Sequence, residues 1–373
     1  MITKRNLAGE QVSLLGFGCM RFPTGKDGKI DRPAATKMID EAMQAGINYY
    51  DTAYMYHDGE SESFVGEALV SRYPRDSFYL ATKLPVIMIE SAEQAKEIFA
   101  EQLARLGTDH FDFYLLHSLN RNTFRERVLG YDLLGLCEEW QREGKIRHLG
   151  FSFHDDFDAF EEILTYRKWD FCQIQYNYMD TENQAGDRGV ALAESLGVPL
   201  VVMEPIRGGN LVRYPEEIRK AFSALDPTRN LANWALSWVG SHTQVKVILS
   251  GMSTCTQLRD NLRTFSNFRS LSGREMNGIG EIVTRIRARV RNGCTGCRYC
   301  MPCPAGVNIP RAFALMNEEA MHGHTAVYKK RYLSTDASAL ASACVSCGAC
   351  LVKCPQHIPV PQDLIKVKQL FGK

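Results

Sequence analysis

Cysteine is concentrated at one end of this 373-residue chain, because eight of its twelve cysteines lie within the last 80 residues. They form two groups of four, each followed directly by a proline: Cys294, Cys297, Cys300 and Cys303, then Cys344, Cys347, Cys350 and Cys354. Three thiolates separated by two residues each can surround one face of an iron-sulfur cube, whereas zinc sites use pairs of Cys-x2-Cys knuckles. The spacing therefore favours iron-sulfur clusters, and a zinc domain is the alternative.

The second group resembles the cysteine run of bacterial ferredoxins, in which the fourth cysteine ligates the other cluster of a two-cluster protein. This resemblance implies one 4Fe-4S cluster on Cys294, Cys297, Cys300 and Cys354 and another on Cys344, Cys347, Cys350 and Cys303. Only two residues separate Cys300 from Cys303, whereas the ferredoxin run has three residues before its fourth cysteine. A single cluster therefore stays an alternative. Because Pro310–His322 favours a helix between the groups, we expect a small, mainly helical two-cluster ferredoxin-like domain over residues 293–373.

A second set of polar residues follows three apolar runs earlier in the chain: Asp51 and Tyr56 in Asp-Thr-Ala-Tyr-Met-Tyr, Lys83 in Ala-Thr-Lys and His117 in Leu-Leu-His. These segments resemble the aldo-keto reductase family and its Asp, Tyr, Lys, His tetrad, over roughly residues 1–268. Spacing alone does not choose between Tyr54 and Tyr56, and the resemblance favours Tyr56. A lone tyrosine, lysine or histidine is more often a surface or core residue, so the inference depends on all four together.

Such a set suits the reduction of a carbonyl, because hydride addition leaves an alkoxide that must take up a proton as it forms. A phenol can supply that proton if a neighbouring cation adjusts its pKa, which is otherwise about 10. We expect Tyr56 to be the phenol and Lys83 the cation, held in place by Asp51. His117 would orient or polarise the substrate oxygen, as one donor of an oxyanion hole does.

The family resemblance also implies that NAD(P)H is the cofactor. Ser152 and Gln173 are implied to hold the nicotinamide carboxamide, and the phosphate and adenine ends would meet Gly208, Gly209, Leu211, Ser250, Gly251, Gln257 and Asn261. Gln257 stands where relatives often have an arginine for the ribose 2′-phosphate, so NAD and NADP both stay open. Two further residues depart from the family pattern: Phe153 stands where relatives often have Asn, and Met203 stands where many have Tyr. For Gly208-Gly209 a simple tight turn is the alternative.

The elements that must position these residues are eight short apolar runs separated by helical patterns. The runs are Leu15–Met20, Asn48–Ala53, Phe78–Lys83, Phe111–His117, Arg147–Phe153, Phe171–Tyr176, Leu200–Glu204 and Val245–Ser250. Strands alternating with helices predict βαβ units and a parallel sheet. Eight units in about 250 residues predict an α/β fold of the TIM (β/α)8 type, with chemistry at the carboxyl ends of the strands.

These patterns divide the chain into three parts. We predict a barrel over residues 1–268, a helical linker over 269–292 and the cluster domain over 293–373. Before the first barrel strand, Ile2–Leu7 and Gln11–Leu14 predict a short hairpin that covers the barrel bottom. The remaining cysteines lie inside barrel elements and are expected to be plain core residues: Cys19, Cys137, Cys172 and Cys255.

Composition narrows the partners. The 44 basic residues against 43 acidic ones leave a formal net charge of +1, which provides no global field for nucleic acid or an anionic membrane. No apolar stretch is long enough to span a bilayer, and the N-terminus has no signal-peptide pattern. We therefore expect a cytoplasmic protein, where grouped cysteines indicate metal rather than disulfides.

Two functions from different classes remain at this point. The first is an NAD(P)-dependent oxidoreductase that interconverts a small aldehyde or ketone and an alcohol, and whose clusters are structural, redox-sensing or connected to an external electron carrier. The alternative is an electron-transfer or redox-sensing protein whose barrel binds nicotinamide with little turnover. An intact tetrad argues for the first, because a binding module has no need of it.

Overall fold

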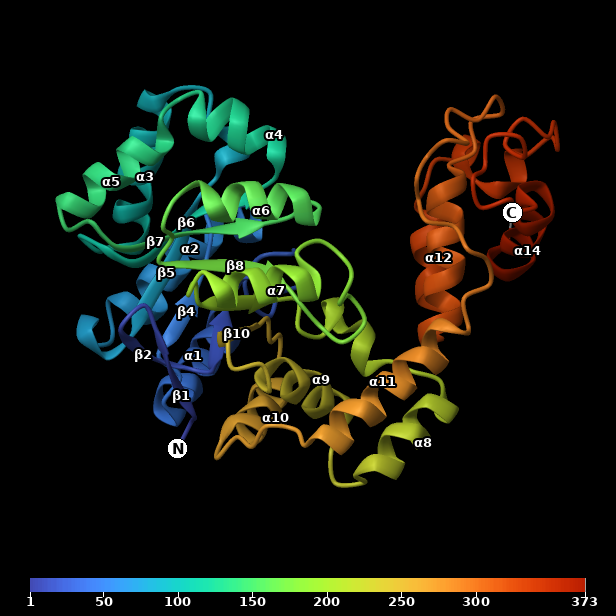
Figure 1. Ribbon diagram of the computed structural model, residues 1–373. Coiled ribbons are helices and arrows are strands. Elements are labelled where there is room, and N and C mark those ends of the chain that lie inside the picture. The colour runs from blue at the N-terminus through green and yellow to red at the C-terminus, as the bar shows by residue number, and fades with distance from the viewer. Residues whose placement is uncertain (373) are drawn as a thin grey trace. The chain divides into compact units, whose positions relative to one another are not determined.

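The computed structural model describes residues 1–372, which form two compact units (Figure 1). The first unit comprises Met1–Gly208 and Ala232–Ser272. The second comprises Gly209–Leu231 and the residues from Gly273 onward. The segment 209–231 thus interrupts the first unit along the chain and folds with the second. The predicted boundaries at residues 268 and 292 stay a prediction.

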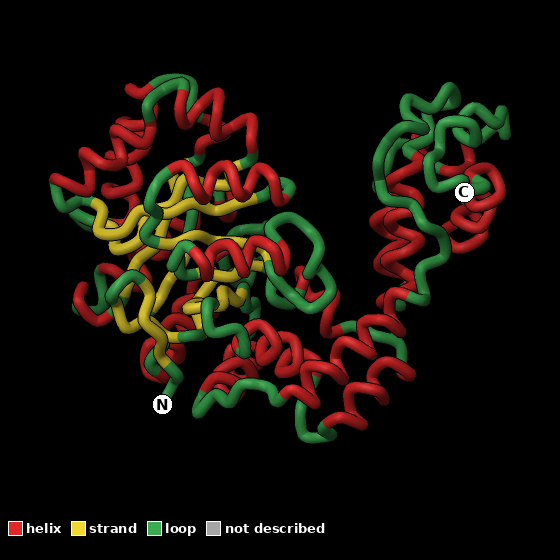
Figure 2. The backbone as a smooth tube through the Cα atoms, in the orientation of Figure 1, coloured by secondary structure: helices red, strands yellow, loops and turns green. Residues whose placement is uncertain are grey.

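The first unit contains a closed barrel of eight parallel strands, whose strands are yellow in Figure 2. Each strand pairs with the next in chain order, and β10 closes the barrel on β3. The strands are β3 (Leu15–Gly18), β4 (Tyr49–Asp51), β5 (Tyr79–Leu84), β6 (Phe111–Leu119), β7 (Ile146–Phe153), β8 (Phe171–Gln175), β9 (Leu200–Met203) and β10 (Val245–Ser250). All eight predicted runs form these strands, so the predicted TIM barrel is confirmed.

A two-stranded antiparallel hairpin precedes the barrel, formed by β1 (Lys4–Leu7) and β2 (Glu10–Ser13). Its turn places Gly9 at a φ of 99°, a conformation that glycine adopts without strain. Leu7 and Val12 are fully buried in one cluster with Tyr49 and Phe171, which lie at the starts of their strands. The hairpin therefore covers the amino end of the barrel, as predicted.

Helices surround the barrel strands in the first unit: α1 (Arg32–Ala45), α2 (Glu60–Val65), α3 (Ala92–Leu106), α4 (Arg121–Thr123), α5 (Leu133–Arg142), α6 (Phe157–Tyr166), α7 (Gly186–Ser195), α9 (Leu231–Gly240) and α10 (Cys255–Phe265). Local sequence explains their ends, as α1 shows. Asp31 accepts a hydrogen bond from the backbone N–H of Ala34, and Gly46 ends the helix at a φ of 93°.

The second unit is helical, with α8 (Glu216–Leu225), α11 (Gly273–Arg287), α12 (Ile309–His322), α13 (Thr325–Leu333) and α14 (Val360–Phe371). Its described residues contain no strand. The core includes Phe313, Tyr332 and Phe371, and six of the eight C-terminal cysteines pack partly buried against it, whereas Cys297 and Cys347 are exposed. The prediction of a mainly helical C-terminal domain is confirmed. Among residues 1–372, no helix is both long and apolar enough to cross a membrane.

Short 3-10 or π turns connect several of these elements: Cys19–Arg21, Tyr56–Gly59, Gly66–Val70, Arg75–Ser77, Val86–Met88, Phe124–Leu129, Arg207–Val212, Ala337–Ala339 and Ala341–Ala343. The turn Tyr56–Gly59 matters most for the site. His57 and Asp58 within it have φ values of 52° and 54°, so the chain reverses sharply after Tyr56.

Candidate functional site

Lys83 and Asp51 form a buried ion pair at the carboxyl end of the barrel strands. Asp51 is the last residue of β4, and Lys83 is next to last in β5. The Nζ of Lys83 donates hydrogen bonds to Oδ1 of Asp51 at 2.6 Å and to the main-chain oxygen of Thr52 at 2.7 Å. The exposed fractions of the two side chains are 0% and 3%, so the ammonium has a fixed position inside the site.

Tyr56 lies within reach of this ammonium. Its Oη is 3.4 Å from Nζ of Lys83, which donates the hydrogen bond. Its ring and the His117 ring form a T-shaped contact, with centroids 5.9 Å apart. Tyr54, in contrast, donates to Glu101 at 2.8 Å on the protein surface. The structure therefore brings Asp51, Tyr56, Lys83 and His117 together and leaves Tyr54 apart.

Burial dominates the pKa of Tyr56. Desolvation raises this pKa, and the charge of Lys83 lowers it by less, so the net direction is upward. Burial lowers the pKa of Lys83, but the charges of Asp51 and Tyr56 outweigh it, and the net direction is up. At neutral pH the phenol is therefore protonated beside a charged ammonium.

His117 is neutral at physiological pH. Burial, followed by the charges of Lys83 and His154, lowers the pKa of His117 to about 3. Its Nδ1 is buried and has no hydrogen-bond partner among the described residues. Since a buried nitrogen without a partner costs free energy, the arrangement fits a group that meets a bound ligand.

The predicted carboxamide contacts, Ser152 and Gln173, face each other in the β7–β8 register. Ser152 Oγ accepts a hydrogen bond from the N–H of Ser118 at 2.7 Å. Gln173 Nε2 lies 3.5 Å from the sulfur of Met203, and its Oε1 is buried without a partner in the part of the chain that the structure describes. An unpaired amide oxygen suits a ligand N–H such as that of a carboxamide.

At the end of β10 and beyond it, hydrogen bonds hold the predicted phosphate and adenine contacts in place. Asn261 Nδ2 donates to Ser250 Oγ at 2.8 Å, and both residues are buried. Gln257 Oε1 accepts from the N–H of Ser253 at 2.8 Å, which fixes the loop. A Cβ on Gly251 would lie 2.6 Å from Cγ of Arg21, so the Arg21 side chain would have to shift if another residue replaced this glycine.

The remaining predicted cofactor contacts follow β9. Gly208 and Gly209 have φ values of 62° and 92°, which a turn alone accounts for. Leu211 is fully buried. Gly208 is the last residue of the first stretch of the barrel unit, whereas Gly209 and Leu211 belong to the second unit.

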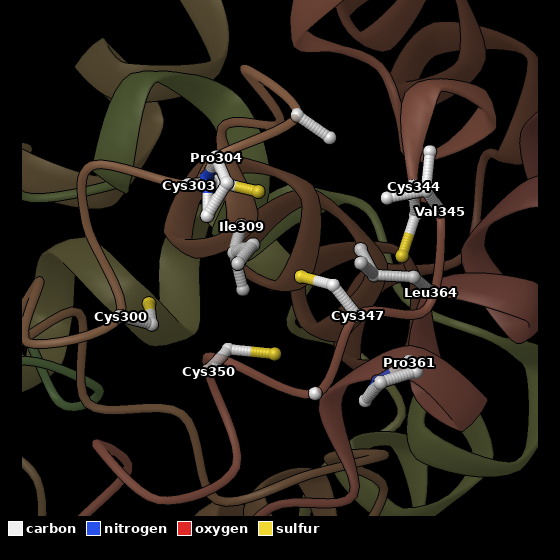
Figure 3. Close-up of a pocket in the computed structure, with 12 residues that line it drawn as sticks. Cys300, Cys303, Pro304, Ile309, Cys344, Val345, Cys347, Cys350, Pro361 and Leu364 are labelled. Carbon is white, nitrogen blue, oxygen red and sulfur yellow. The ribbon is translucent and has the colours of Figure 1, made fainter.

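The C-terminal thiols line two small cavities inside the second unit. One is lined by Cys294, Cys297, Cys300 and Cys354. The other, shown in Figure 3, is lined by Cys303, Cys344, Cys347 and Cys350, and also by Cys300. The first cavity therefore includes one cysteine from the opposite run, Cys354, and the second includes two, Cys300 and Cys303.

These thiols surround cavities and do not converge on a point. Within residues 1–372, no three His, Cys, Asp or Glu side chains are grouped to hold a single metal ion. In a 4Fe-4S cluster each thiolate binds a different iron, whereas zinc requires all its thiolates at about 2.3 Å from one ion. A donor set made of thiols alone, distributed around two cavities, fits iron-sulfur clusters.

Three buried polar residues of the site were missed by sequence reasoning, namely Ser61, Glu62 and Gln102. They contact the strand ends that carry Asp51 and Lys83. The available signal was weak, because Glu60-Ser61-Glu62-Ser63 has the composition of an exposed helix start. Three of the four barrel cysteines are core residues as predicted: Cys19, Cys137 and Cys172 are buried, and burial raises the pKa of each thiol. For Cys255 the prediction was wrong, because this residue begins α10 and is only partly buried.

Comparison with known proteins agrees with this geometry. Residues 14–284 match the sequence description of the aldo/keto reductase family. The chain belongs to the aldo/keto reductase family. Residues 293–358 of this aldo/keto reductase match the 4Fe-4S dicluster domain, which confirms the predicted combination of a barrel with a ferredoxin-type domain.

Solved and curated relatives of this aldo/keto reductase are similar over the barrel. An aldo-keto reductase from Bacillus halodurans is 29% identical, with a TM-score of 0.64 over 76% of this chain and 96% of that chain. The NADH-specific methylglyoxal reductase of Escherichia coli (strain K12) is 27% identical over 74% of this chain and 96% of its own. An oxidoreductase of Bacillus subtilis (strain 168) is 26% identical over 72% and 92%. The chain is therefore an oxidoreductase enzyme of this family.

Proposed function

We propose that the barrel interconverts a small aldehyde or ketone and its alcohol with NAD(P)H, and that Tyr56 donates or accepts the proton. The observation that supports this most directly is the Lys83 ammonium, which bridges Asp51 at 2.6 Å and the Tyr56 hydroxyl at 3.4 Å. This arrangement holds a protonated phenol and a positive charge at one point of the barrel mouth. That is the requirement for proton delivery to a developing alkoxide.

In this proposal each side chain has one task during reduction. Tyr56 Oη gives its proton to the substrate oxygen, and the ammonium of Lys83 stabilises the phenolate that remains. Asp51 keeps Lys83 charged and in place. His117, neutral because of its low pKa, can donate a hydrogen bond to the substrate oxygen without adding a second charge.

The nicotinamide, when bound, supplies or removes the hydride. Gln173 and Ser152 would hold its carboxamide, and the unpaired Oε1 of Gln173 supports this. Gly208, Gly209, Leu211, Ser250, Gly251, Gln257 and Asn261 are proposed for the remainder of NAD(P)H. Gln257, which accepts a hydrogen bond from the N–H of Ser253, carries no positive charge for a ribose 2′-phosphate, so NAD and NADP both stay open.

We further propose that the eight C-terminal cysteines hold two 4Fe-4S clusters with crossed ligation. The membership of the two thiol-lined cavities supports this, since Cys354 joins the first run and Cys303 the second. A cluster exchanges single electrons, whereas a hydride carries two, so the clusters do not exchange directly with the nicotinamide in this proposal. Redox-active clusters would instead exchange electrons with an external electron carrier. Ligation by free thiolates requires a reducing compartment, and a cytoplasmic location is part of the same proposal.

The alternative, an electron-transfer or redox-sensing protein with little turnover, leaves the tetrad geometry unexplained. A protein that only binds nicotinamide needs no buried ammonium beside a tyrosine, since burying a charge costs free energy. Turnover therefore distinguishes the two functions.

The test uses full-length protein purified without oxygen. Iron and sulfide are measured first, and about eight irons per chain are expected for two clusters, against about four for one. NADH or NADPH consumption is then followed with a series of small aldehydes, including methylglyoxal, and ketones. Carbonyl-dependent consumption is expected; tight NAD(P)H binding without any consumption would instead support the redox-sensing alternative.

A further inference from the structure

Ser61 and Glu62 lie in the first turn of α2, and both side chains are fully buried. No step of the proposed proton transfer uses them. A buried carboxylate is costly unless it is hydrogen-bonded, so its partners indicate what the residue is for.

Glu62 contacts β5 directly next to Lys83. Its Oε1 accepts hydrogen bonds from Thr82 Oγ1 and Gln102 Nε2, both at 2.6 Å. Its Oε2 lies 3.4 Å from Nη1 of Arg105. All three donors therefore converge on one carboxylate.

Gln102 extends this contact to the main chain of Lys83. Its Nε2 donates to the main-chain oxygen of Lys83 at 3.0 Å, and its Oε1 accepts from the hydroxyl of Tyr114 at 2.6 Å. The strand end that carries the ammonium is thus fixed at two successive residues, Thr82 and Lys83.

The loop that carries Tyr56 is fixed by the same elements. Ser61 Oγ lies 2.9 Å from Thr52 Oγ1, and Thr52 supplies the main-chain oxygen that accepts from Lys83 Nζ. Arg105 Nη1, the partner of Glu62, also donates to the main-chain oxygen of Tyr54 at 3.4 Å. The carboxylate of Glu62 therefore connects the supports of both Lys83 and the turn before Tyr56.

We propose that Glu62 is a positioning residue of the barrel site, which acts through Thr82, Gln102 and Arg105 to set the separation of Lys83 Nζ and Tyr56 Oη. This inference rests on the proposed role of Tyr56 in proton transfer. Asp112 provides a contrast. It is an equally buried carboxylate, bonded to Arg75 and to the N–H of Leu80, but it lies near the amino ends of the strands.

Displacement of Lys83 has a specific electrostatic consequence. Burial raises the pKa of Tyr56, and the charge of Lys83 lowers it. Because the attraction between the ammonium and a phenolate falls with distance, a longer Lys83–Tyr56 separation weakens the lowering effect and raises the pKa of Tyr56. Carbonyl reduction requires the protonated phenol. The rate of reduction falls as the pH rises through the pKa of Tyr56, and this fall is the alkaline limb of the pH profile. A higher pKa of Tyr56 moves the alkaline limb to higher pH.

The test compares Glu62→Ala and Glu62→Gln with two controls, the exposed Glu67→Gln on the following turn and the buried Asp112→Asn. Glu62→Ala is expected to lower kcat by about tenfold, with KM changed by less than about twofold, and to move the alkaline limb of kcat upward by about half a pH unit or more. Glu62→Gln, which keeps an acceptor oxygen, is expected to recover most of kcat. Neither control should move the limb.

The inference would be overturned if Glu62→Ala changed neither kcat nor the alkaline limb of its pH profile. It would also be overturned if Glu62→Ala lowered kcat without moving the alkaline limb and Asp112→Asn had the same effect. If Glu62→Ala does not fold, Gln102→Met removes the link to the Lys83 main chain at similar volume and is held to the same criteria.

Wild-type protein that reduces no carbonyl would contradict the proposed function alone. Amide hydrogen exchange over residues 52–59 then decides the positioning role. Faster exchange in Glu62→Ala than in Asp112→Asn supports that role, and equal exchange overturns it.

Discussion

The Lys83 ammonium and the Asp51 carboxylate are 2.6 Å apart, and neither side chain reaches solvent by more than 3% of its surface. An ion pair buried in this way gains little net stability, because desolvation of both charges offsets their attraction. Its value is positional. The pair places one positive charge beside Tyr56 and His117, where a substrate oxygen would develop negative charge.

Removal of one partner of this pair is expected to reduce both stability and activity. Lys83→Met should lower the free energy of unfolding by about 3–5 kcal/mol, because Asp51 is left as an uncompensated buried charge. The double variant Lys83→Met/Asp51→Asn should regain most of that stability but none of the activity. Urea unfolding and turnover of the three proteins check this; a double variant no more stable than Lys83→Met would contradict the pairing.

His117 is expected to stay neutral throughout the working pH range. Its pKa of about 3 lies below the value of 6.5 that it has when unfolded, so the unfolded chain binds more protons between these limits. This residue therefore contributes stability that is complete above pH 6.5 and is lost as the pH falls through the folded pKa. Imidazole nitrogen NMR shifts, assigned with His117→Asn, measure the titration directly. A His117 midpoint near 6.5 in the folded protein would refute the burial argument.

Pairs of cysteine substitutions test crossed ligation. Cys294→Ser/Cys354→Ser removes two ligands from one proposed cluster and should leave about four irons per chain. Cys303→Ser/Cys354→Ser removes one ligand from each cluster and should lower the iron content further, with Cys255→Ser as the unaffected control. If the first pair lost as much iron as the second, the assignment of Cys354 to the Cys294 cluster would be wrong.

Two glycine substitutions are expected to change stability in opposite directions. A Cβ on Gly66 would lie 2.5 Å from the main-chain oxygen of Arg105, so Gly66→Ala should cost about 1–3 kcal/mol. Gly280 lies within α11, where a Cβ would meet no atom within 4 Å beyond its chain neighbours and the backbone of its own helix, and Gly280→Ala should gain about 0.5–1 kcal/mol. Thermal unfolding of both variants under anaerobic conditions measures the difference; equal shifts of the same sign would contradict it.

The barrel and the site were predictable from sequence to different depths. Val245–Ser250 forms β10 at the predicted residues, because an apolar run between polar ends specifies a buried strand. Asp51 and Lys83 could be placed because parallel strands end at one face of a barrel. Spacing alone could not choose between Tyr56 and Tyr54; the family resemblance favoured Tyr56, and the structure places the Tyr56 hydroxyl 3.4 Å from Lys83 Nζ while Tyr54 bonds to Glu101.

Two features depend on tertiary structure and had no usable sequence signal. Glu62 lies among charged and hydroxyl residues typical of an exposed helix, yet it is fully buried against Thr82 and Gln102. The segment 209–231 follows a barrel strand, but it folds with the second unit. Within that unit Tyr214 stacks on His322 with centroids 5.3 Å apart, a contact between residues distant in sequence that no local pattern predicts.

The most direct test of the central claim compares Tyr56→Phe with Tyr54→Phe in anaerobically purified full-length protein. With a carbonyl that the wild type reduces, Tyr56→Phe should lower kcat by about 100-fold or more while NAD(P)H binding is retained, because the ring remains and only the proton donor is lost. Tyr54→Phe, which loses a surface hydrogen bond to Glu101, should stay close to wild type. Full activity in Tyr56→Phe would contradict the account.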